Sequence, residues 1–100
     1  MTDLARHLRQ LQADVDQLAA SRDAARRAVD TAMQEYERRR RYAPAGTATR
    51  AAHTAWALAG REWWSAVTAH AAAEDLLRSE RRNVDRAADD ALLTPTRRRS

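Results

Sequence analysis

His70 and Glu74 form the nearest approach of this chain to a metal-binding or acid–base pair, because residues four apart share one face of a helix. Helical di-iron sites, such as those of two-helix encapsulated ferritins, use Glu-x-x-His. That motif is missing, since Val67 stands three residues before His70 and Arg50 three before His53. We read His70 as a packed or register-setting histidine, and we predict no metal, no cofactor and no small-molecule substrate.

Nucleophilic chemistry has no recognisable setting in this sequence. Ser21, Ser65 and Ser79 stand outside any Gly-x-Ser-x-Gly turn, and the chain has no cysteine. No glycine-rich phosphate loop or dinucleotide motif is present. We therefore predict that the protein is not an enzyme.

Arginine is the remaining residue type with binding chemistry, since it supplies all 18 basic residues. Residues 34 to 61 hold six arginines against Glu35 and Glu37, a local net charge of +4. A basic end of this kind can bind phosphates, but arginines at the C-terminal end of a helix also suit its dipole without a ligand. We treat nucleic acid as the less favoured partner. Its candidate contacts are Arg38, Arg39, Arg40, Arg41, Arg50, Arg97, Arg98 and Arg99.

These residues lie on two segments with a heptad repeat, which is the pattern of coiled-coil helices. The first repeat runs through Leu4, Leu8, Leu11, Val15, Leu18, Arg22, Ala25, Val29, Ala32 and Tyr36. The second sets Trp56, Trp63, His70, Leu77, Val84 and Ala91 against Ala52, Ala59, Ala66, Ala73, Glu80 and Ala87. Pro44 and Gly46 separate the segments. We predict a helix over about 2–42, a turn over 43–48 capped by Thr47 or Thr49, and a helix over about 49–93.

Composition favours close helix packing over a conventional globular core. Alanine contributes 24 residues, whereas leucine and valine together contribute 13. We predict an all-α fold: an antiparallel two-helix hairpin, an alanine-rich coiled coil, that associates into a four-helix bundle or a larger helical assembly. Residues 1–93 form this single domain, and residues 94–100 form a disordered arginine-rich tail because Pro95 stops the helix.

The register of the hairpin is open between two values. The preferred register pairs positions whose residue numbers add to 95, so that Leu11 faces Val84 and Tyr36 faces Ala59. A tighter turn gives layers that add to 88. In both, a bulky residue mostly faces a small one, which fills the seam without voids. Three polar residues, Arg22, His70 and Glu80, interrupt the seam, where they can specify register or oligomeric state.

Trp63 and Trp64 are neighbours and point about 100° apart on a helix, so both cannot enter one seam. Trp64 belongs to a second apolar row, the Trp64 stripe, which consists of Ala57, Gly60, Trp64, Val67 and Ala71. Two readings remain: Trp64 lies against the side of the hairpin, or it binds another helix. We favour the interface, with Trp56, Gly60, Trp64, Val67 and Ala71 as its residues and Ala24 and Ala28 as small residues that admit a close neighbour.

The layout of about 100 residues in two antiparallel helices resembles the small WXG-type substrates of type VII secretion, which pair as helical-hairpin dimers. The family's Trp-x-Gly turn is replaced here by Tyr42-Ala43-Pro44-Ala45-Gly46-Thr47. The segment most similar to the Trp-x-Gly motif is Leu58-Ala59-Gly60. No Tyr-x-x-x-Asp/Glu export signal follows the second helix. The resemblance implies a substrate or partner of such a system that lacks the signature.

The function predicted from these patterns is association: a hairpin that self-associates or binds a helical protein partner. The arginine-rich nucleic-acid binder and the type VII partner are the alternatives. No signal-peptide core and no uncharged apolar stretch of membrane-spanning length occur, so we expect a cytoplasmic protein without a membrane span. A leaderless export route stays open.

Overall fold

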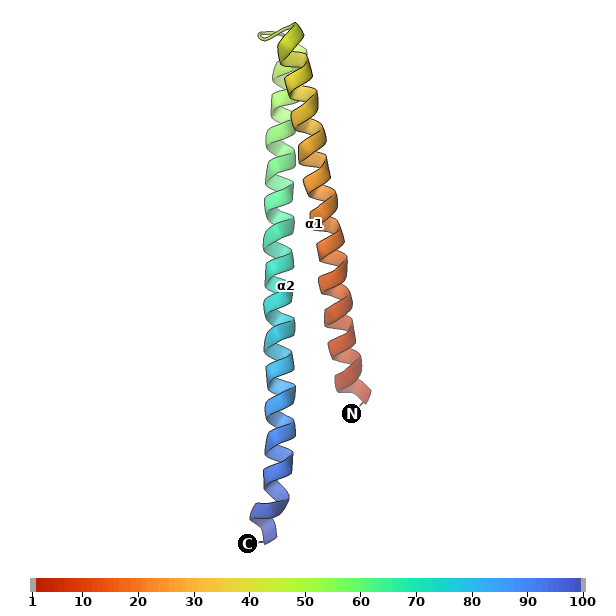
Figure 1. Ribbon diagram of the computed structural model, residues 1–100, viewed down its shortest axis with the longest axis vertical. Helices are drawn as coiled ribbons and strands as arrows, with labels where there is room; N and C mark the ends of the chain where they lie inside the picture. Colours follow the sequence, from red (N-terminus) through yellow and green to blue (C-terminus); the bar gives the residue numbers. More distant parts are fainter. Residues whose placement is uncertain (1, 100) are drawn as a thin grey trace.

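Two long helices joined by a short turn make up the protein in this computed structural model (Figure 1). Helix α1 runs over Thr2–Tyr42 and helix α2 over Thr47–Arg99. The structure describes residues 2–99, and it describes the side chains of residues 3–93. The helices lie side by side as an antiparallel rod of 83 × 19 × 13 Å, and α2 continues past the N-terminal end of α1 (Figure 1). The predicted all-α two-helix hairpin is confirmed, whereas its assembly into a bundle stays a prediction.

The helix bounds follow the prediction closely for α1 and differ from it for α2. Helix α1 ends at Tyr42, as predicted from Pro44. Helix α2 begins two residues earlier than predicted, and its backbone continues six residues past 93 to Arg99. Proline removes one backbone donor and one hydrogen bond, and here the helix continues through that loss. The predicted helix stop at Pro95 is therefore wrong for the backbone, and the disorder of the tail stays a prediction.

The turn is closed by backbone hydrogen bonds at both helix ends. The Ala43 amide donates to the Arg39 carbonyl at 2.9 Å, and the Gly46 amide donates to the Ala43 carbonyl at 3.0 Å. The Arg50 amide donates to the Gly46 carbonyl at 3.1 Å, which makes Gly46 the N-cap of α2. The predicted threonine cap is therefore wrong. Thr49 is buried and donates its hydroxyl to the Ala43 carbonyl at 2.5 Å, so it holds the turn closed from inside.

Gly46 suits the tightness of this turn. A Cβ atom there would lie 3.1 Å from the Ala43 Cβ and 3.2 Å from the Ala43 carbonyl oxygen, which is tighter than nine in ten such contacts. Its φ is not positive, so the restriction is steric crowding and not backbone handedness. The smallest residue thus allows the chain to reverse within four residues.

The apolar core lies toward the open end of the hairpin. Of the described side chains, the buried apolar ones are Leu11, Val15 and Leu77, and Leu8 and Ala73 pack against them. Leu77 and Ala73 are thus the α2 partners of Leu11 and Val15 in this cluster, and Val84 is not among them. The preferred register of 95, with Leu11 against Val84, is wrong.

Contacts nearer the turn show that neither predicted register holds. Arg22 meets His70 and Tyr36 meets Trp56, and the residue numbers of both pairs add to 92. Tyr36 was predicted to face Ala59, but it stacks on Trp56, with ring centroids 5.5 Å apart. The reason is the length of the turn. Because α2 begins at Thr47, fewer residues separate the helices than the predicted turn of 43–48 would supply, and each α1 residue meets an earlier residue of α2.

Candidate interaction surface

The two adjacent tryptophans of α2 lie in different environments. Trp63 is partly buried between the helices, and the Arg26 guanidinium carbon lies 5.0 Å from its ring centroid, which is cation–π geometry. Trp64 is 66% exposed. Most of the indole is therefore open to solvent.

The residues around Trp64 leave room beside it. Gly60 and Val67 are partly buried, whereas Ala57 and Ala71 are exposed. A methyl group placed at Gly60 would meet no atom within 4 Å. The steps of three and four residues put these five residues on one face of α2, which flanks the seam with α1. The Trp64 stripe is thus an open apolar face with a large ring next to a notch.

Trp56 belongs to the hairpin and not to this face. It is partly buried and packs with Tyr36 and His53 in an aromatic cluster. The Tyr36 and His53 centroids lie 5.2 Å apart and those of His53 and Trp56 lie 6.1 Å apart, both edge-to-face. His53 was not assigned this role from sequence. Its position next to the seam residue Ala52, three residues before Trp56, is the signal that could have placed it there.

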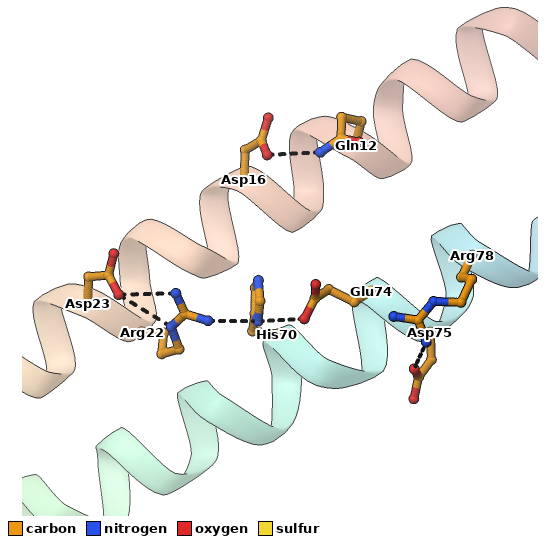
Figure 2. Close-up of polar contacts among 8 residues, drawn as sticks. All are labelled: Gln12, Asp16, Arg22, Asp23, His70, Glu74, Asp75 and Arg78. Carbon is orange, nitrogen blue, oxygen red and sulfur yellow. Dashed lines mark hydrogen bonds and ion pairs between the residues drawn. The ribbon is translucent and has the colours of Figure 1, made fainter. Parts of the chain in front are cut away.

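Two of the three predicted polar seam residues meet across the helices (Figure 2). His70 is buried, and its Nδ1 lies 3.1 Å from Nη1 of Arg22 and 3.2 Å from Oε1 of Glu74. Asp23 accepts from Nε and Nη2 of Arg22, so the guanidinium is held from both sides. An imidazole nitrogen either accepts or donates. Nδ1 therefore accepts from Arg22 when it carries no proton and donates to Glu74 when it carries one.

Glu80, the third polar seam residue, lies further along α2. Its Oε2 is 3.9 Å from Nε2 of His7, a long contact between half-exposed side chains. The neighbouring Arg81 donates from Nη2 to Oε1 of Gln12 at 2.8 Å, a link between the helices that the sequence patterns did not single out. The polar residues of the seam thus form two separate groups.

The arginine run at the end of α1 is partly neutralised within its own helix. Nε of Arg39 donates to Oε1 of Glu35 at 2.7 Å, and Arg38 donates to Oε2 of the same carboxylate. Hydrogen bonds from Arg39 and then Arg38 hold the pKa of Glu35 below its ordinary value of 4.5. Two of the four arginines of the run are therefore turned toward a carboxylate.

The rest of the basic end is open to solvent. Arg40 and Arg41 are exposed and line a shallow hollow with Glu37, and Tyr42 is 86% exposed. Arg50 is also exposed, and its Nη1 makes a long 3.4 Å hydrogen bond to the Ala45 carbonyl. The side chains of Arg97, Arg98 and Arg99 lie outside the described residues.

Metal binding and membrane insertion are two further possibilities for the part of the chain that the structure describes. No three His, Asp or Glu side chains gather there in a way that would hold a metal ion. Neither helix has, over its described residues, an apolar stretch that would reach across a lipid bilayer. The surface that stands out is therefore the Trp64 stripe.

Comparison with known proteins adds no family to this description. No protein-family model matches the chain, and neither a curated protein nor a solved structure matches it.

Proposed function

We propose that this protein is a non-enzymatic assembly module that associates with a helix of another subunit or protein through the Trp64 stripe. The observation that carries the proposal is the exposure of Trp64, which is 66% on a helix face without another described element against it. Tryptophan is enriched among the residues that dominate protein–protein binding energy. A helix seated on this face would cover both the ring and the notch at Gly60.

The shape of the hairpin supports the same proposal. A rod of 83 × 19 × 13 Å has little interior, and each of its helices is covered by the other along one side only. Burial of apolar surface stabilises by roughly 25 cal/mol per Å², so covering the exposed apolar face would stabilise a complex. Helical bundles are stabilised in this way, because their helices bury apolar faces against one another.

The test is the mass of the complex in solution. We expect Trp64→Ala and Val67→Ala to shift the protein to a smaller species in light scattering at a concentration where the unmodified chain is associated. Leu58→Ala is the matched control, since Leu58 is 51% exposed on another face of α2. An unchanged mass in both stripe variants would remove the self-association form of the proposal.

Binding to nucleic acid is a second candidate, favoured by the exposed Arg40, Arg41 and Tyr42 at one end of the rod. Arginine contacts to phosphates make affinity fall steeply with salt, and an exposed aromatic ring can stack on a base. Replacing Arg38 to Arg41 by serine should then weaken binding to single-stranded DNA or RNA and flatten its salt dependence. No binding of the unmodified chain at low salt would end this candidate.

A third candidate rests on the architectural resemblance to WXG-type hairpins. It predicts a second hairpin protein of similar size that co-purifies with this chain. The location we propose for the assembly is the cytoplasm, with leaderless export as the corresponding alternative for this third candidate. A pull-down with Trp64→Ala as the control tests whether such a partner uses the same stripe.

A further inference from the structure

We infer that the occupant of the Trp64 stripe is a second copy of this chain, with α2 packed antiparallel on α2 about a twofold axis level with residue 62. The inference rests on the proposed function, because it names the partner of the same surface. It follows from three features of the stripe: the order of its large and small residues, the open space at Gly60, and the distribution of charge on either side of residue 62.

The stripe is complementary to its own reverse. When two antiparallel helices meet with the axis at residue 62, residues equally far before and after 62 face each other. Trp64 of each copy then faces Gly60 of the other, and Val67 faces Ala57. A large residue meets a small one at both levels, and the symmetry repeats each contact, as in other twofold interfaces.

Gly60 has no packing role inside the hairpin that would require a glycine. A Cβ atom there would meet nothing within 4 Å. Glycine in the interior of a helix is destabilising relative to alanine, so the position weakens α2 without relieving any contact in the chain. If the Trp64 ring of a second copy packs against Gly60, the missing side chain leaves room for that ring. The same contact covers the Trp64 ring, which is exposed in the single chain.

The charges on α2 favour the antiparallel arrangement over the parallel one. On α2, residues 47–61 hold Arg50 and Arg61 and no carboxylate, whereas the mirror range 63–77 holds Glu74 and Asp75 and no arginine. Asp75 is paired with Arg78 at 3.0 Å within its own helix, so Glu74, whose side chain is 46% exposed, is the carboxylate that can meet a second copy. The axis at residue 62 sets these segments against each other and brings Arg50 level with Glu74 of the second copy. A parallel pairing sets like charges together and Trp64 against Trp64.

One residue works against the pairing. Arg61 lies one position from the axis, so the two copies bring this side chain near its counterpart. It sits beside the stripe and not on it, where a long arginine can extend into water. The approach lowers the affinity without changing which residues face each other.

Distances between spin labels test the axis directly. The chain has no cysteine, so Thr54→Cys, Ala72→Cys and Ser79→Cys each carry one label per copy, away from the stripe. At 1.5 Å per residue, the separations along the axis should be about 24, 30 and 51 Å, growing with distance from residue 62. Equal separations at the three sites would mean a parallel pairing and would overturn the inference.

Two sets of variants test the contacts. Gly60→Leu fills the notch with a strong helix former, so the hairpin should stay helical in circular dichroism while association weakens at least tenfold. Arg50→Glu and Glu74→Arg should each weaken association by about fivefold, and the double exchange should restore it. Glu74→Gln controls for the contact of this carboxylate with His70. If both single variants weaken the dimer and the double exchange does not restore it, Arg50 and Glu74 do not meet.

The outcomes separate this inference from the proposed function. If Trp64→Ala removes the associated species but the label distances do not grow from residue 62, the assembly role stands and the twofold arrangement fails. If the chain is a monomer that binds a different helical protein through Trp64, the second copy is likewise the wrong occupant. If Trp64→Ala changes neither the mass nor any binding, both fail.

Discussion

The hairpin is built in two ways along its length. Toward the open end, aliphatic side chains fill the seam, and the buried residues Leu11, Val15 and Leu77 lie there. Toward the turn, aromatic rings take their place: Trp56 stacks on Tyr36 inside the hairpin, while Trp64 stays outside. The Arg22–His70 contact lies between the two regions. The buried apolar contacts of the single chain are therefore concentrated in one region, and the exposed tryptophan on which the proposed association rests lies in the other.

This separation has a physical basis in residue size. Leucine and valine are short enough to interlock between two closely spaced helices, whereas two adjacent tryptophans exceed what one seam can hold. In α2, Trp63 faces the seam and lies under the Arg26 guanidinium, whereas Trp64 points to solvent. If the separation holds, substitutions in the two regions should affect different measurements, and four experiments test this.

The largest effect is expected at the aliphatic end. Leu77 is 5% exposed, and its replacement by alanine removes buried methyl groups and leaves a void. We expect Leu77→Ala to lower the free energy of unfolding by about 2–3 kcal/mol in urea titrations followed by circular dichroism. The measurement belongs in a Trp64→Ala background at fixed concentration, because association also adds to apparent stability.

Leu76 provides the matched control, since it is the sequence neighbour of Leu77 and is 50% exposed. Leu76→Ala should change the free energy of unfolding by less than about 0.5 kcal/mol. Similar losses for the two variants would mean that the aliphatic region does not carry the stability of the chain, and the comparison would fail.

The junction between the regions should respond in the opposite direction. His70 and Arg22 have side chains that are 11% and 35% exposed, so their contact is made at some cost in desolvation. Replacing such a polar pair by apolar residues is often stabilising. We expect the double variant Arg22→Leu, His70→Leu to gain about 1 kcal/mol in the same titration and to form a mixture of species in light scattering. A loss of 1 kcal/mol or more would show that the pair itself stabilises the fold.

The turn region is tested by its two glycines. In the Trp64→Ala background, Gly60→Ala should raise the free energy of unfolding by about 0.5–1 kcal/mol, because alanine is the better helix former and meets no neighbour. Gly46→Ala is its counterpart and should be destabilising, since the added methyl would crowd Ala43. In the unmodified background, Gly60→Ala should weaken association while it stabilises the hairpin. Changes of the same sign in both properties would contradict the separation.

Much of this fold could be predicted from the sequence, because heptad spacing and Pro44 report directly on helix faces and helix ends. The register could not be chosen in the same way. Layers that add to 95 and to 88 both set large residues against small ones, whereas the contacts across the helices add to 92. The register depends on how tightly the chain reverses at Gly46. The tightness of the turn depends on steric crowding around Gly46, and heptad spacing carries no information about it.

The candidate surface was predictable in outline for a similar reason. The 100° step between adjacent residues places Trp63 and Trp64 on different faces whatever the register, and the structure agrees. Trp56 was assigned to the same surface, yet it packs with Tyr36 and His53, because a seam residue near the turn meets whichever α1 side chain the register brings to it. Predictions that depend on one helix alone therefore held better than those that depend on two.

The smallest effect is expected at Glu35, beside the turn. Arg39 and Arg38 hold the pKa of this carboxyl below 4.5, so the ionised form is favoured in the folded state. The contribution to stability is present above the ordinary pKa and is lost as the pH falls through the lowered folded-state pKa. Glu35→Gln should therefore lower the midpoint temperature slightly at pH 7, by less than any other substitution above, and the difference from the unmodified chain should close in acid. Because the carboxylate is exposed, added salt should shrink the same difference at pH 7. A difference that persists below the folded-state pKa would mean that Glu35 acts by packing and not by charge.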